Sequence, residues 1–182
     1  MLRPEVGRAY DRAMSHIRDA VSGASAYLTE HPDEARYRDA HARARLSDGL
    51  RVEVDGPGGE QLVTDMPRSI GGGAAAPSPG WYFRAAAAAC VASLIGIRAA
   101  ATGLDLPGDT VSVTVDSESD DRGILGLDDA IPAGALSMRV SVSITEVSID
   151  RAAFEAVVRW AVDHCPVTDT TARAVPLEIE LA

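Results

Sequence analysis

The hydrophobic pattern of the chain changes from helical to strand-like near residue 38. Over about the first twenty residues apolar side chains recur three or four positions apart, which predicts an amphipathic helix. These positions are Val6, Tyr10, Ala13, Ile17 and Val21. Pro32 and Asp33 then offer a fresh helix start within the less regular stretch 27–37.

Alternation with a period of two predicts three strands after this helical region. Residues 40–46 alternate small apolar with polar side chains, which is typical of a half-buried strand, and residues 50–54 alternate again. Turn residues at 47–49 and 56–59 separate these segments from a short third strand at 61–65. The order predicts an antiparallel meander.

The centre of the chain predicts one long helix. Residues 71–77 are rich in glycine and alanine and are interpreted as a flexible linker. Ser78 suits the N-cap position and Pro79 the first helical position, while Gly103 marks the end of the helix. Because residues 85–97 are apolar on every face, this helix must be covered on all sides, in a core or between subunits.

Further strands are predicted in the last third of the chain. Residues 111–115 and 138–144 alternate on either side of an acidic segment, 116–129, which is interpreted as a solvated loop. A polar turn is expected at 168–173, followed by a final strand at 177–181.

A second strong helix is predicted between these strands. Asp150 is placed to cap it, Ile149 to contact Phe154, and Pro166 to stop it. The order is therefore helix, three strands, long helix, two strands, helix, strand, which indicates the α+β class and not a doubly wound sheet.

Composition and charge restrict the function. The chain has 17 basic residues, all arginine, and 27 acidic residues, which gives a net charge of -10. Without a basic run it is poorly suited to nucleic acid or to anionic membranes. The apolar stretch 85–101 contains Arg98 and is predicted to be a buried helix, not a membrane span. The N-terminal sequence lacks the apolar region of a signal peptide, so a reducing cytoplasm is the expected location.

The two cysteines are candidates for chemistry. Cys90 lies within the apolar central helix and Cys165 ends the apolar stripe of the next helix, so both face a core or an interface. Each could be a small buried hydrophobe, or a nucleophile, which requires the thiolate form. Cys90 lies about three turns from the helix start, so the helix dipole helps it little. Because the chain has no lysine, a stabilising cation must be arginine or histidine.

Metal and phosphate sites are not predicted. The four histidines do not pair with the cysteines at a zinc-like spacing. The glycines at 71–73 lack the lysine and the spacing of a phosphate loop, and the acidic segment 116–129 lacks the pattern of a calcium loop. No cofactor is expected.

Several short segments resemble the OsmC/Ohr family. They are Met66-Pro67-Arg68-Ser69-Ile70-Gly71-Gly72, the proline-containing helix start at 77–80, Ala-Ala-Cys90, and His164-Cys165-Pro166-Val167-Thr168 followed by the strand at 175–181. The resemblance covers about residues 38–182. It divides the chain into an N-terminal helical extension, 1–37, and an OsmC-like domain, 38–182.

This resemblance implies antiparallel sheets around a long buried central helix and a second packed helix, in an intertwined homodimer. It also implies a thiol-dependent peroxidase that reduces organic hydroperoxides. Cys90 corresponds to the cysteine that attacks the peroxide and becomes a sulfenic acid. Cys165 corresponds to the cysteine that resolves it as a disulfide, which an external dithiol reduces. Walls of alanine, valine and leucine suit an organic peroxide better than a strongly hydrated one.

The chain departs from the family pattern at the site that stabilises the thiolate. The family has a glutamate ten positions before the first cysteine, where it holds an arginine, and this chain has Gly80. The position of that arginine falls near Ser47, so the flanking Arg45 and Arg51 are the candidates to replace it. Both could equally be solvated strand arginines.

Two other functions compete with the peroxidase. A non-enzymatic family member could bind a small apolar ligand in a pocket at the dimer interface. Gly80 favours that alternative, whereas the presence of both cysteines favours the enzyme. A purely structural dimer with inert buried thiols has no positive feature beyond composition.

Overall fold

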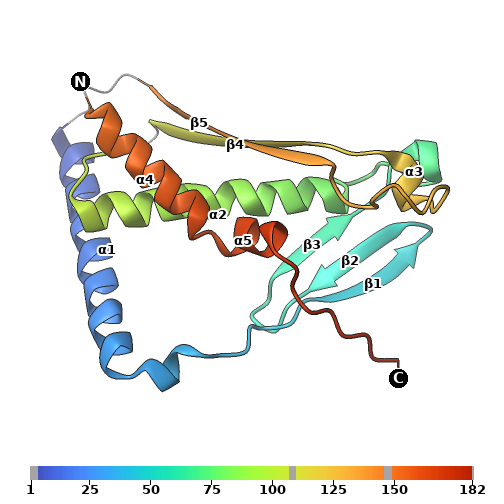
Figure 1. Ribbon diagram of the computed structural model, residues 1–182, viewed down its shortest axis with the longest axis horizontal. Coiled ribbons are helices and arrows are strands. Elements are labelled where there is room, and N and C mark those ends of the chain that lie inside the picture. The colour runs from blue at the N-terminus through green and yellow to red at the C-terminus, as the bar shows by residue number, and fades with distance from the viewer. Residues whose placement is uncertain (1–3, 107–109, 146–148, 182) are drawn as a thin grey trace. The chain divides into compact units, whose positions relative to one another are not determined.

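The computed structural model describes residues 4–106, 110–145 and 149–181 (Figure 1). The chain forms two compact units. One comprises residues 1–26 and 86–182, and the other comprises residues 27–85. The boundary between them falls inside the long helix α2, Pro79–Thr102.

The unit of residues 27–85 contains the predicted antiparallel meander. Strands β1 (Arg43–Asp48), β2 (Arg51–Asp55) and β3 (Gln61–Thr64) pair in the order β1-β2-β3. The prediction that the first strand is half-buried was wrong, because all six residues of β1 are exposed. β1 is an edge strand, and within this unit neither face of it is covered. The fresh helix start near Pro32 exists only as a 3₁₀ turn, η1 (Pro32–Ala35).

The segment that leads into α2 is held by a buried carboxylate and is not a loose linker. Asp65 is only 3% exposed, and its two oxygens accept hydrogen bonds from three backbone N–H groups further along the segment. These donors are Met66 at 2.8 Å, Gly73 at 3.3 Å and Ala75 at 2.9 Å. The turn also needs Gly72, because a Cβ there would collide with the carbonyl oxygen of Met66. A short 3₁₀ turn, η2 (Arg68–Ile70), lies within the segment.

Helix α2 begins and ends as predicted. The Ser78 side chain accepts from the Trp81 N–H at 3.2 Å, and Pro79 occupies the first turn. At the other end Gly103 has φ +71°, and its N–H and that of Leu104 return to the carbonyls of Ala100 and Ala99. This pairing is a Schellman motif, which satisfies the last carbonyls of the helix.

Within the described part of one chain only one face of α2 is buried, so the expected cover of its other faces, in a core or between subunits, stays a prediction. The buried residues are Ala87, Val91, Ile95, Ala99 and Ala100. By length and composition α2 could also cross a membrane, but core helices of soluble proteins have the same properties. In this chain the buried face of α2 builds the core with α4, Arg151–Asp163.

The unit of residues 1–26 and 86–182 also contains a two-stranded antiparallel ribbon. Strands β4 (Val111–Glu118) and β5 (Ser137–Ile144) pair along their full length, and Figure 1 shows them as a long ribbon. Their alternating burial confirms the predicted period of two. The acidic segment between them contains a short helix, α3 (Asp121–Ile124), which Asp120 caps.

The helices that follow β5 confirm one prediction and correct two. Asp150 caps α4 by accepting from the N–H groups of Ala152 and Ala153. Pro166 begins a new helix, α5 (Pro166–Ala172), where a polar turn was expected. Residues 177–181, expected to form a strand, are an extended segment. Among the described residues of this chain no strand pairs with it, so its backbone groups have no partners in a sheet.

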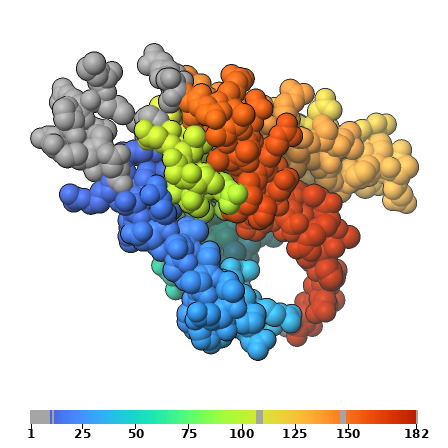
Figure 2. All heavy atoms as spheres, turned by 60° about the vertical axis from the view of Figure 1, so that its left-hand side comes forward, coloured from blue at the N-terminus to red at the C-terminus, as the bar shows by residue number. Residues whose placement is uncertain are grey.

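The N-terminal helix α1 runs over Pro4–Glu30, further than the pattern predicts. The Arg18 guanidinium donates to the Ala100 carbonyl at 2.8 Å, and the Leu106 N–H donates to the Tyr10 hydroxyl at 3.2 Å. Figure 2 shows part of α1 (blue) against the end of α2 (yellow-green). Through Tyr10 and Arg18, α1 is therefore docked at the C-terminal end of α2.

The buried carboxylate gives a prediction for stability against pH. The three N–H donors, of which Ala75 is the strongest influence, hold the pKa of Asp65 below its usual value of 3.8. The ionised form therefore stabilises the folded state above that pH, and this contribution is lost as pH falls through the lower folded pKa. Asp65→Asn should lower the urea midpoint at pH 7, and its difference from wild type should narrow below pH 4.

The matched control is Asp55→Asn, since Asp55 forms an exposed ion pair with Arg45. Its effect at pH 7 should be smaller. Equal losses in the two variants, or a difference that does not change with pH, would contradict a special role for Asp65.

Candidate active site

The two cysteines meet where α2 packs against α4. The residues buried between these helices form the core cluster of the unit. They are Val91, Ile95 and Ala99 from α2, Phe154, Val157 and Ala161 from α4, together with Leu106 and Cys165. Cys90 lies on α2 at the edge of this cluster and interacts with Cys165 at the N-cap of α5. The structure thus brings together two thiols that are 75 positions apart in the sequence.

The two thiols have different surroundings. Cys165 is fully buried, whereas Cys90 is half-buried. Burial and the neighbouring Cys165 raise the pKa of the Cys90 thiol, and the Val167 N–H opposes this only in part. Taken alone, this unit does not activate Cys90.

The pKa of Cys165 shifts in the opposite direction. Burial raises it, but the N–H of Thr168 and the Cys90 thiol outweigh burial, with smaller help from the Thr168 hydroxyl and the Val167 N–H. The pKa of Cys165 therefore lies below its usual value. Thr168 is fixed in this position because its hydroxyl donates to the carbonyl of Val162 at 2.7 Å.

The contribution of Thr168 was missed in the sequence because residues 168–173 were interpreted as a turn. A usable signal was present, since proline is favoured at the first position of a helix and Pro166 directly follows Cys165. The sequence Cys-Pro-Val-Thr places Thr168 at the third helical position, where its N–H faces back toward the cap.

The candidate arginines belong to the other unit. Arg45 donates to Asp55 at 2.7 Å across the β1–β2 pair, and more than half of its side chain is exposed. Arg51 is half-buried at the start of β2, and its charge helps to lower the pKa of Asp65. Arg45 and Arg51 lie in the unit of residues 27–85 and Cys90 lies in the other unit, so a role for either arginine at Cys90 stays a prediction.

The position of the missing glutamate has room for a side chain. A Cβ at Gly80 would lie 3.7 Å from the Arg84 guanidinium and 3.9 Å from the Ser78 hydroxyl, which are ordinary contact distances. Gly80 lies in the first turn of α2, and its φ is not in the left-handed region. The backbone therefore does not require glycine there.

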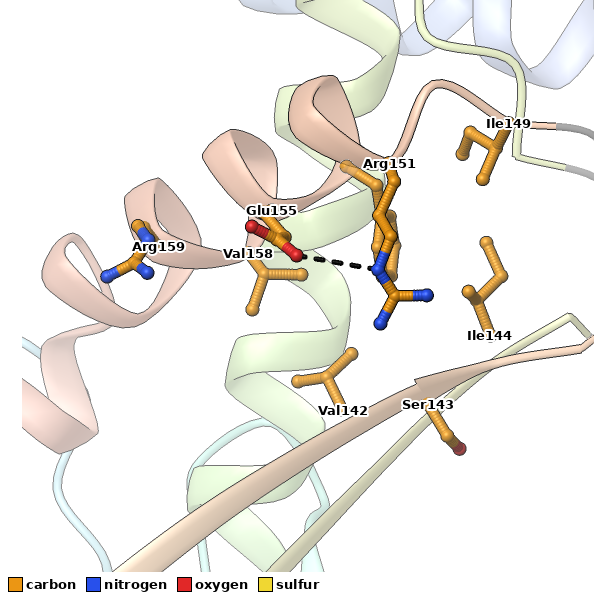
Figure 3. A pocket seen from close by; sticks show the side chains of 9 residues that line it. Val142, Ser143, Ile144, Ile149, Arg151, Glu155, Val158 and Arg159 are labelled. Carbon is orange, nitrogen blue, oxygen red and sulfur yellow. Dashed lines mark ion pairs between the residues drawn. The ribbon is translucent and has the colours of Figure 1, made fainter.

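A groove of about 980 Å³ lies between β5 and α4 (Figure 3), and neither cysteine lines it. Its apolar lining consists of Val142, Ile144, Ile149, Phe154 and Val158. Figure 3 shows the Arg151 side chain extending from α4 into the groove toward β5; its guanidinium is 3.6 Å from Glu155, and Arg159 also lines the groove. The hydrophobic pattern predicts that these faces are apolar but not that a space remains between them. Among the described residues, no group of three or more histidine, cysteine or acidic side chains could hold a metal ion.

Comparison with protein families shows which family the chain is related to. The family of OsmC-like proteins matches residues 71–180, which include both cysteines. The chain belongs to the OsmC-like protein family. The resemblance seen in the sequence is thus confirmed, and the α+β architecture with small antiparallel sheets and packed helices is that of OsmC/Ohr structures.

Solved structures of OsmC-like proteins have the same fold at low identity. An organic hydroperoxide resistance protein, OsmC, from Legionella pneumophila is 26% identical, with a TM-score of 0.52 over 74% of this chain and 89% of that chain. An organic hydroperoxide resistance protein from Elizabethkingia anophelis is 18% identical, with a TM-score of 0.58 over 75% and 90%. An OsmC-like protein from Mycoplasma pneumoniae is 13% identical, with a TM-score of 0.62 over 75% and 89%. No curated protein sequence matches the chain.

The surroundings of the two thiols predict the order in which they ionise. In the reduced protein, thiolate absorbance near 240 nm should rise in two steps as pH increases, with Cys165 responsible for the first. Cys165→Ser should remove the first step, because it removes the thiolate that the Thr168 N–H stabilises. Cys90→Ser should keep it, since a hydroxyl can still donate to the Cys165 sulfur. The opposite assignment would contradict the arrangement described here.

Proposed function

We propose that this OsmC-like protein is a thiol-dependent peroxidase that reduces organic hydroperoxides with Cys90 and Cys165. The observation that carries the proposal is the contact between two thiols of unequal exposure at the α2–α4 junction. A half-buried sulfur can be reached by a substrate, whereas a fully buried one can react only with its neighbour. Cys90 is therefore assigned the attack on the peroxide, and Cys165 the resolving step.

The chemistry balances with these two groups. The Cys165 thiolate takes the proton of Cys90, and the resulting Cys90 thiolate attacks the terminal peroxide oxygen. The O–O bond breaks, Cys90 becomes a sulfenic acid, and the alkoxide takes the proton back from Cys165 to leave as an alcohol. The Cys165 thiolate then attacks the sulfenic sulfur and expels hydroxide, which forms the disulfide. An external dithiol reduces this disulfide by exchange, so that the cycle can repeat.

Transfer of the proton from Cys90 to Cys165 needs a cation near Cys90, because the pKa of Cys90 is the higher of the two. Arg51 is the better candidate. Arg45 is already neutralised by Asp55, whereas Arg51 makes no ion pair with any side chain in the described part of the chain. No cofactor or metal takes part in this scheme.

The activity is tested by consumption of an organic hydroperoxide in the presence of a dithiol. Cys90→Ser should abolish turnover, and Cys165→Ser should allow the peroxide to be attacked but should not form the internal disulfide. Arg51→Gln should reduce the rate near pH 7 about tenfold, which corresponds to losing about 1.4 kcal/mol of charge interaction. Arg45→Gln is the matched control and should change the rate much less. Equal rates in wild type and Cys90→Ser would refute the enzyme.

The alternative is a non-enzymatic family member that binds a small apolar ligand. The raised pKa of Cys90 and the glycine at position 80 favour this alternative. It predicts that an apolar ligand binds equally well to wild type and to the Cys90→Ser variant, with no consumption of peroxide in either.

We also propose that the protein is a homodimer in which the C-terminal segment of each copy packs on the other. Leu177, Ile179 and Leu181 are 83–93% exposed and alternate with Glu178 and Glu180. Figure 1 shows this segment extended away from the helices that precede it. Large apolar side chains with this exposure are typical of a surface that a partner covers.

The groove between β5 and α4 has properties complementary to this segment. Its lining includes five apolar side chains and two arginines, Arg151 and Arg159, whose charge is opposite to that of the two glutamates, although Arg151 already lies 3.6 Å from Glu155. Among the described residues β5 pairs only with β4, so its other edge is available for a strand from a second copy. This pairing would supply the partner that the predicted strand at 177–181 lacks within one chain.

The dimer is tested by light scattering at micromolar concentration. Wild type should be a dimer whose interface buries more than ~2,000 Å² in total. The double change Leu177→Asp with Ile179→Asp should give a monomer, because two charges would be buried in the groove. Leu127→Asp, a change at an exposed leucine between β4 and β5, is the control and should leave the dimer intact. A monomeric wild type would contradict the proposal.

A reducing cytoplasm is the proposed location, since both thiols are free and the cycle needs a dithiol reductant. Neither nucleic acid nor a membrane is among the proposed partners, in keeping with the net charge of -10.

A further inference from the structure

A cluster of one cation and two aromatic rings connects α2, which carries Cys90, with the end of α4 directly before Cys165. The guanidinium carbon of Arg98, on α2, lies 4.8 Å from the centre of the Trp160 ring on α4. The Trp160 ring stacks on that of His164, with 4.2 Å between the ring centres and 15° between the planes. His164 is also tied to its own helix, with its Nδ1 2.9 Å from the Trp160 carbonyl.

Each member of the cluster lies close to a cysteine along its helix. Arg98 follows Cys90 by eight residues, or about 12 Å of helix. His164 directly precedes Cys165, and Trp160 is one further turn back. A contact between Arg98 and Trp160 therefore fixes the end of α4, and with it Cys165, against the helix that carries Cys90.

The contact between the Arg98 guanidinium and the Trp160 ring is partly shielded from water. Arg98 and Trp160 are both half-buried, and a cation over an indole ring is attracted more strongly when the pair is partly removed from water. In the described part of the chain Arg98 forms no ion pair that would compete. The end of a helix otherwise frays readily, so Cys165 at the junction of α4 and α5 depends on contacts of this kind.

We infer that Arg98, Trp160 and His164 are positioning residues that hold the Cys165 sulfur buried beside that of Cys90. The inference rests on the proposed two-cysteine function for its purpose but not for its test. The cluster does not touch peroxide. It acts by keeping one sulfur at a high effective concentration relative to the other.

The first experiment measures how fast N-ethylmaleimide alkylates Cys165 in the reduced full-length protein, followed by mass spectrometry of the labelled peptide. Arg98→Gln and Trp160→Leu should each speed alkylation of Cys165 about fivefold or more, because the end of α4 opens more often. Arg98→Lys and Trp160→Phe keep a cation and a ring, and should stay within about twofold of wild type.

Two controls separate positioning from general loss of stability. Arg122→Gln removes an exposed arginine outside the cluster and should leave the rate unchanged. Val113→Ala weakens the β4–β5 ribbon instead. When the two variants are compared under conditions that make their free energies of unfolding equal, Cys165 should be alkylated more slowly in Val113→Ala than in Trp160→Leu. Unchanged alkylation in both Arg98→Gln and Trp160→Leu, or equal labelling in Val113→Ala and Trp160→Leu, would overturn the inference.

The second experiment measures the Cys90–Cys165 disulfide at equilibrium with a dithiothreitol redox buffer. Loss of the cluster should lower the stability of the disulfide up to about tenfold, or about 30 mV for this two-electron couple, with recovery in the two conservative variants. Neither readout involves peroxide. A wild type without peroxidase activity but with faster alkylation in the variants would refute the proposed function and support the positioning role. If wild type has peroxidase activity and the variants match it in both the alkylation rate of Cys165 and the stability of the disulfide, the positioning role is refuted and the proposed function is supported.

Discussion

The packing of α4 against one face of α2 is the contact on which the site depends. Ala99 of α2 and Ala161 of α4 are both completely buried in the core cluster that the two helices share. This packing brings Cys165 to Cys90, and it excludes water from the Cys165 sulfur more than from the Cys90 sulfur. Differences in exposure and in hydrogen-bond donors then separate the two thiols chemically, although they are the same residue type.

Most of the fold could be predicted from local signals. The caps of α2 and α4, the β1–β3 meander and the β4–β5 ribbon follow from Ser78, Gly103 and Asp150 and from alternation with a period of two. These features depend on residues near one another in the sequence, so a single sequence contains enough information. The convergence of Cys90 and Cys165 could be expected only from the resemblance to a family.

The features that were missed depend on residues far apart or on a second molecule. Asp65 orders a segment that its glycines alone suggested was loose, because its three N–H partners lie up to ten residues away. A uniformly apolar helix predicts burial but not which face is buried, so the exposed side of α2 could not be identified. The C-terminal segment has the alternation of a strand, yet alternation cannot supply the strand it needs to pair with.

The contact of α1 with the end of α2 bears on how this chain evolves. The Arg18 guanidinium and the Tyr10 hydroxyl satisfy backbone groups at residues 100 and 106, which lie inside the region shared with the OsmC-like family. A loosely attached extension drifts in sequence independently of the domain it precedes. Here both bonds are made to backbone groups, so selection for the docking of α1 acts on Arg18 and Tyr10, whereas residues 100 and 106 can change without losing them, except to proline at 106.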